Sequence, residues 1–121
     1  MPHVVIENAG SLREHAAAFT PIQERTDDGI LKIEDVYLSS RGTQALALAV
    51  VVEGGPPVKF FIDLLEKGSA ITVRLYPMTD PEKTPGVRKV MALVAAQIRR
   101  AAPGSSWGKT NLQDFLPVAI D

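Results

Sequence analysis

The 121-residue chain contains no cysteine and only two histidines. Without cysteine, disulfide bonds, thiol catalysis and cysteine-bound metal sites are excluded. The two histidines, His3 and His15, have no histidine partner four residues away, so the zinc-binding helix motif is absent as well. We therefore expect no metal site of these two kinds.

The chain also lacks an excess of one charge and a long apolar run. Its formal net charge is −1, and its Lys and Arg residues are spread along the chain, which does not indicate binding to nucleic acid. The longest apolar run, "ALALAVVV" at 45–52, is far shorter than the roughly twenty residues that span a bilayer. No basic segment precedes an apolar one at the N-terminus, so we predict no signal peptide. These absences lead us to expect a cytoplasmic protein that binds neither nucleic acid nor membrane.

The length of the chain predicts a single domain, 1–121, because a chain of about this size buries roughly two-thirds of its unfolded surface. Apolar periodicity and turn signals predict strands at 3–7, 30–39, 44–54 and 71–77 and a helix from Thr84 to near Ala102. The segment 58–68 fits both helix and strand, and the turn and strand that follow favour a hairpin. The tail, 103–121, shows no clear strand. The expected order is β-α-β-β-β-β-α-tail, an α+β fold with two helices packed on a mostly antiparallel sheet.

Two successive helix-start signals lie between the first and second strands. Ser11 with Glu14 forms a capping box, and Thr20 before Pro21 repeats the start signal. We therefore predict a broken or kinked helical segment over 11–27, ended by the turn residues at 27–29.

Both faces of the predicted strand at 44–54 are apolar. Leucine and valine occupy 46, 48, 50 and 52, and alanine occupies 45, 47 and 49. This pattern is typical of a central strand covered on both sides. The alanine side would let a helix or another backbone approach closely.

The segment "PGSSWGKT", 103–110, contains two motifs that suggest enzymes. "GSSWGKT" resembles a nucleotide-binding P-loop, but Pro103 stands where that motif needs its first glycine. "GSSWG" matches the serine-hydrolase elbow, yet both histidines precede Ser106, whereas the elbow needs its acid and histidine later in the chain. A helix, not a strand, is predicted before the segment. We interpret it as a helix exit that anchors Trp107.

The N-terminus is more informative, because "MPHVVIE" places a proline directly before a strand. Removal of Met1 would expose a secondary amine on Pro2. An α-amine loses its proton slightly above neutral pH, and burial or nearby cations lower that pKa further. A neutral amine held rigidly by a strand can act as a general base.

"MPHVVIE" and "LRE" at the start, and "KTNLQDFL" at 109–116, resemble the two ends of carboxymethyl-hydroxymuconate isomerases in the tautomerase superfamily. The helix containing "VRKVMALVAAQI" is placed like that family's second helix. The resemblance implies a tautomerase-like fold and a homotrimer. It also implies a cofactor-independent isomerase, in which Pro2 moves a proton on a small unsaturated keto or enol carboxylic acid.

The resemblance further implies cationic side chains that hold the substrate's carboxylate. The nearest chemical candidates are Arg41, in a turn, and Arg74, in "ITVRLYP". Lys109 and Asn111 match the family's tail pattern, so they are candidates for positioning the tail or for contacting the ligand. Trp107 and Phe115 are expected to anchor the tail through apolar contacts.

A second hypothesis from a different class stays open. The chain could be a non-catalytic oligomeric α+β module that shares the ends of the superfamily without its chemistry. An apolar pocket at Pro2 with at least one Arg or Lys facing it would favour the isomerase. A Pro2 packed against a neighbouring strand without a cavity would favour the module.

Overall fold

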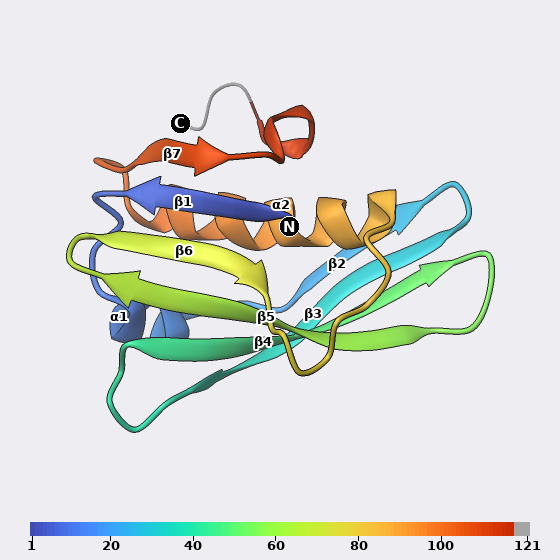
Figure 1. Ribbon diagram of the computed structural model, residues 1–121, viewed down its shortest axis with the longest axis horizontal. Helices are drawn as coiled ribbons and strands as arrows, with labels where there is room; N and C mark the ends of the chain where they lie inside the picture. The colour runs from blue at the N-terminus through green and yellow to red at the C-terminus, as the bar shows by residue number, and fades with distance from the viewer. Residues whose placement is uncertain (118–121) are drawn as a thin grey trace.

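The structure is a computed structural model that describes residues 1–117. It is an α+β domain with one seven-stranded sheet in the order β2-β3-β4-β5-β6-β1-β7, in which every neighbouring pair is antiparallel (Figure 1). The α+β class, the antiparallel sheet and the two packed helices are confirmed. The strands are β1 His3–Glu7, β2 Ile22–Thr26, β3 Gly29–Leu38, β4 Gln44–Glu53, β5 Val58–Lys67, β6 Ala70–Leu75 and β7 Ser106–Thr110.

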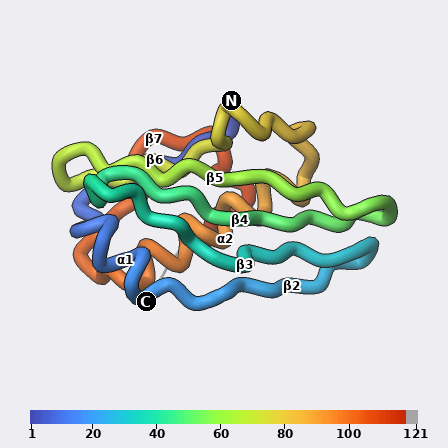
Figure 2. Tube along the Cα trace, turned by 90° about the horizontal axis from the view of Figure 1, so that it is seen from below, coloured from blue at the N-terminus to red at the C-terminus, as the bar shows by residue number. Residues whose placement is uncertain are grey.

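Helices α1 (Leu12–Ala18) and α2 (Pro85–Ala101) pack on the same face of the sheet, which curls around them (Figure 2). The alanines of β4 lie on this face, and Ala45, Ala47 and Ala49 are at most 1% exposed. Their small side chains let α2 approach the sheet, as the sequence pattern predicts. No helix within residues 1–117 is long and apolar enough to cross a membrane.

The ambiguous segment 58–68 is a strand, β5. Phe60, Ile62 and Leu64 alternate toward the helices and are at most 3% exposed, whereas Phe61 and Leu65 lie on the opposite face. The period is two because β5 pairs with β4 on one side and β6 on the other.

The prediction of a helical segment over 11–27 is wrong beyond α1. The Ser11 hydroxyl caps α1 by accepting a hydrogen bond from the Glu14 N–H (3.4 Å), but the helix ends at Ala18. Residues 22–26 form β2, an edge strand paired with β3, and Thr26 lies opposite Gly29. The acidic pair 27–28 is therefore a two-residue hairpin loop and not the end of a helix. The helix-start signal at Thr20 and Pro21 depends only on neighbouring residues. Backbone pairing of residues 22–26 with β3 overrides it.

The tail also contains a strand that we did not predict. β7 lies against β1, with Trp107 opposite Ile6 and Thr110 opposite Val4, and a bulge separates these two pairs. Its sequence, "SWGKT", has no apolar alternation, so only the free edge of β1 makes it a strand. Trp107 and Phe115 pack against the core, which confirms their role as anchors.

The β7 strand also explains the two motifs in "PGSSWGKT". A P-loop and a nucleophile elbow both follow a strand and lead into a helix, whereas this segment follows α2 and forms β7 itself. Only the short 3-10 turn Gln113–Phe115 comes after it, and residues 118–121 lie outside the described part of the tail. Neither motif has the elements it needs.

The N-terminus of α2 is fixed to the end of β4. The Thr84 hydroxyl accepts from the Val87 N–H (3.2 Å) and donates to Glu53 Oε1 (2.5 Å), and the Gly86 N–H donates to Glu53 Oε2 (2.9 Å). A Cβ on Gly86 would lie 2.6 Å from the Glu53 carboxyl carbon, so a larger residue here would displace the carboxylate from these hydrogen bonds. The carboxylate therefore satisfies the Gly86 N–H of the first turn and holds the capping hydroxyl of Thr84, which fixes the start of the helix.

Candidate functional site

A cavity of about 280 Å³ lies at the start of β1. Three separate parts of the chain form its wall: the N-terminus, the beginning of α2 with the loop before it, and the tail after β7. The lining residues are Met1, Pro2, Lys83, Arg88, Asn111 and Leu112. Pro2 shares the cavity with two cationic side chains, as the isomerase hypothesis predicts, but three of the six lining residues are polar or charged, so it is not the apolar pocket that we expected.

Pro2 is placed by the alternation of β1. His3 lies opposite Arg74 in the sheet, whereas Pro2, Val4 and Ile6 point to the face that carries the helices. Pro2 is buried and Met1 is 75% exposed. With Met1 attached, the Pro2 nitrogen is an amide without a basic lone pair, so base chemistry at this position requires that Met1 is removed.

Asn111 joins the tail to the N-terminus. Its Oδ1 accepts from the His3 N–H (2.9 Å), and its Nδ2 donates to the Met1 carbonyl oxygen (2.7 Å). The Asn111 N–H and the Thr110 hydroxyl both donate to the His3 carbonyl oxygen, at 3.3 and 2.8 Å. Because the His3 N–H must meet an acceptor, the side-chain amide of Asn111 is fixed with its NH2 group beside residues 1 and 2.

Two cations line the cavity, and no acidic residue does among those described. Lys83 Nζ lies 2.6 Å from Asp80 Oδ1, and its side chain is 32% exposed. Arg88 is exposed in the second half of the first turn of α2 and has no ion pair with the described residues. The N-terminal end of a helix dipole is positive, so it disfavours a cation such as Arg88 and favours a bound anion. The cavity is thus suited to a small anion.

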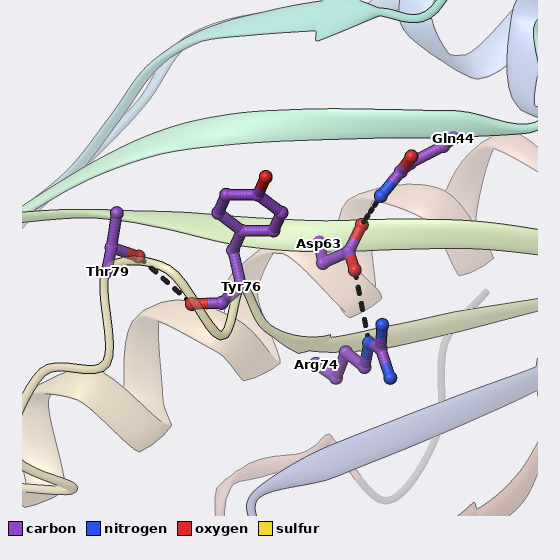
Figure 3. A network of polar contacts seen from close by, with 5 residues as sticks. All are labelled: Gln44, Asp63, Arg74, Tyr76 and Thr79. Atoms are coloured by element: carbon purple, nitrogen blue, oxygen red, sulfur yellow. Dashed lines mark hydrogen bonds and ion pairs between the residues drawn. The ribbon is translucent and has the colours of Figure 1, made fainter.

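Arg74 lies on the opposite face of the sheet from Pro2 and is engaged by an acid (Figure 3). Its Nε donates to Asp63 Oδ2 at 3.1 Å, and the Gln44 amide donates to Asp63 Oδ1 at 2.9 Å. The Asp63 side chain is only 1% exposed, while that of Arg74 is 44% exposed. The guanidinium therefore compensates a buried carboxylate and does not line the cavity.

The two other candidate cations also lie outside the cavity. Arg41 is exposed in the turn between β3 and β4, where neighbouring Gly42 faces Arg13 of α1, at the end of the sheet away from the N-terminus (Figure 1). Lys109 is exposed on β7. Of the residues singled out in the sequence, the structure brings together Pro2 and Asn111 and leaves Arg41, Arg74 and Lys109 elsewhere.

Sequence reasoning missed Lys83 and Arg88. Both flank the start signal of α2, and the first turn of this helix contains no acidic residue. Since acidic residues are normally favoured there, the basic pair around Thr84 and Pro85 was a usable signal. Within residues 1–117, no group of three His, Asp or Glu side chains could hold a metal ion.

The face of the sheet away from the helices carries the Asp63–Arg74 pair and also an apolar cluster, which forms a second notable surface. We call it the outer face; its core consists of Tyr37, Leu46, Leu48, Phe61 and Leu65. None of these five residues is fully buried, and Tyr37 is 52% exposed. The Phe61 ring meets those of Tyr37 and Tyr76 edge to face, at 6.3 and 6.5 Å between centroids. Apolar residues on both sides of β4 indicate that this face is suited to being covered.

Comparison with known proteins adds no relative to this geometry: the chain matches no family model, no curated protein and no solved structure.

Proposed function

We propose that the protein is a cofactor-independent isomerase of the tautomerase type, which moves a proton on a small unsaturated keto or enol carboxylic acid. The observation that carries the proposal is the cavity in which Pro2 lies with Arg88, Lys83 and Asn111. The resemblance of both chain ends to carboxymethyl-hydroxymuconate isomerases supports it, and so does the tail strand, which brings "KTNLQDFL" beside "MPHVVIE". The cytoplasmic location is part of the proposal.

In the proposed reaction, the Pro2 amine removes a proton from the carbon next to the substrate's carbonyl group. The C–H bond breaks, an N–H bond forms on Pro2, and the electron pair forms the double bond of an enolate. Pro2 then gives the proton to the enolate oxygen or to a conjugated carbon, so the net change is isomerisation, whereas return to the same carbon only exchanges the hydrogen. Arg88 and Lys83 attract the substrate's carboxylate to the cavity that contains Pro2.

The first prediction compares the protein with and without Met1. Intact mass identifies the two forms, and ultraviolet absorbance follows the enol-to-keto exchange of a simple 2-oxo acid. We expect exchange with the mature form only, because the Pro2 nitrogen is an amide in the other. Pro2→Ala should lower the rate by about tenfold, since alanine keeps an α-amine but loses the rigidity of the ring. Equal rates in mature protein, Met1-bearing protein and Pro2→Ala would rule out Pro2 as the base.

A non-catalytic oligomeric module is the second candidate, and the outer face favours it. An apolar surface over the central strands is a typical place for a second copy of the chain to pack. A homo-oligomer, a trimer by resemblance, is compatible with either function.

The second prediction concerns this assembly. We expect light scattering after gel filtration to give a multiple of the 13.1 kDa chain mass. Leu48→Lys should reduce the mass to that of one chain, because it places a charge in the centre of the outer face. Ala17→Lys, at an exposed position of α1, is the matched control and should leave the mass unchanged. A wild-type protein that elutes as a monomer argues against the module.

A further inference from the structure

The Met1 carbonyl oxygen occupies a hydrogen-bond donor in the cavity beside Pro2. It is attached to the carbon bonded to the Pro2 nitrogen, and it accepts the Asn111 Nδ2–H at 2.7 Å. Met1 and Asn111 both line the cavity. Removal of Met1 therefore frees the amine of Pro2 and the hydrogen-bond donor of Asn111, together with His3 Nδ1, which contacts the same carbonyl oxygen at 3.0 Å.

The freed donor stays aimed at the same place. Asn111 Oδ1 remains bound to the His3 N–H at 2.9 Å, and the Asn111 backbone remains bound to the His3 carbonyl. Both bonds belong to the β1–β7 edge and are independent of Met1. A donor held in advance beside the base is suited to an oxygen that gains negative charge as the base removes a proton.

We propose that Asn111 is a specificity-determining residue, whose Nδ2 takes the 2-oxo oxygen of a 2-oxo carboxylic acid in the place of the Met1 carbonyl. This inference rests on the proposed function. The two ends of the substrate are then distinguished by different chemistry: Arg88 attracts the carboxylate, and Asn111 donates to the keto oxygen. When Pro2 removes the proton from carbon 3, the carbonyl electron pair moves to that oxygen, which Asn111 stabilises until the proton returns.

The test compares two acids that differ only in the keto group, 2-oxobutanoate and butanoate. Their dissociation constants for the mature protein are measured by NMR titration, after intact mass has shown that Met1 is gone. We expect 2-oxobutanoate to bind about tenfold more tightly, the effect of one hydrogen bond to a preorganised donor. In the Met1-bearing protein the ratio should fall below twofold, because the Met1 oxygen occupies the donor.

Asn111→Asp is the informative variant, because its carboxylate still accepts the His3 N–H but donates nothing. The added charge weakens both acids alike, so the ratio of the two constants is the readout, and it should fall below twofold. Asn111→Ala adds no charge and also removes the donor, so the ratio of the two dissociation constants should fall below twofold in this variant as well. Asn8→Asp is the matched control, since the Asn8 amide donates to the Gly104 carbonyl (3.2 Å), and its ratio should stay near tenfold.

The outcomes separate this inference from the proposed function. If the mature protein exchanges the carbon-3 protons of 2-oxobutanoate but binds both acids equally, the role of Asn111 is wrong and the isomerase stands. A tenfold ratio that persists in Asn111→Asp and Asn111→Ala overturns the inference as well. If neither acid binds and no exchange occurs, the proposed function fails and takes the inference with it.

Discussion

Arg88→Glu is expected to lower kcat/KM of the mature protein for a 2-oxo acid by about 100-fold. Arg88 has no ion pair with the described residues and lines the cavity with Pro2, so its charge is available to a carboxylate. A charge-assisted hydrogen bond contributes roughly 1.5–3 kcal/mol, and a glutamate in its place would repel the substrate. Steady-state kinetics over a series of substrate concentrations checks this, and we expect the loss mainly in KM.

The same substitution should not destabilise the fold. Arg88 stands near the N-terminus of α2, where a negative charge interacts favourably with the helix dipole, by about 0.5 kcal/mol at an exposed site. Glu53 already binds the Gly86 N–H, but residues 86 and 88 point to opposite sides of the helix. We therefore expect a slightly higher free energy of unfolding together with the loss of activity.

Arg100→Glu is the matched control at the other end of α2. Arg100 is exposed in the last turn, where a positive charge is favourable. Its replacement should lower stability slightly and leave kcat/KM unchanged. If Arg88→Glu retains full activity, Arg88 does not bind the substrate, and if both variants lose activity, the effect is one of net charge.

Arg74→Met is expected to lower the free energy of unfolding by about 3 kcal/mol. It removes the cation that compensates the Asp63 carboxylate, whose side chain is 1% exposed and keeps only the Gln44 amide as a partner (Figure 3). A buried charge that loses its counter-ion is strongly destabilising. Urea unfolding, followed by circular dichroism, measures the change.

Replacing the other partner of the pair, in Asp63→Leu, should change the free energy of unfolding by less than about 1 kcal/mol. Arg74 is 44% exposed and can extend into water, and the leucine would lie opposite Leu46 on the outer face. The double variant, Asp63→Leu with Arg74→Met, should therefore be more stable than Arg74→Met alone. Such a non-additive result is typical of directly coupled residues. Equal losses for both single variants would show that the pair stabilises the fold by mutual attraction and not by compensation of a buried charge.

The elements that sequence analysis predicted well are those whose apolar period lies within one segment. The long helix has Val87, Val90, Met91 and Val94 on one face, and β4 alternates alanine with leucine over residues 45–49. In such segments the side chains themselves specify the buried face, so local reasoning suffices. The apolar residues of β5 fit both a helical and a strand period, and hydrogen-bonded pairing with β4 and β6 makes this segment a strand.

The elements that sequence analysis missed are the two edge strands, β2 and β7. Each has five residues and a single paired side, so few of its side chains are buried and no clear alternation develops. Their conformation depends on the backbone groups offered by β3 and β1, which belong to distant parts of the sequence. No local pattern contains that information.

The same division holds for the candidate site. The sequence by itself determined the α+β class, the long helix and the hairpins, because these follow from local residue patterns. It also identified Pro2 and Asn111 as candidate site residues, from the motifs at the two chain ends. Only the tertiary structure decided that Asn111 reaches residue 1, that Arg88 and Lys83 share the cavity with Pro2, and that Arg74 serves Asp63 instead. The physical reason is that the cavity is enclosed by three separate segments, 1–2, 83–88 and 111–112. They meet only when β7 pairs with β1 and α2 packs against β1.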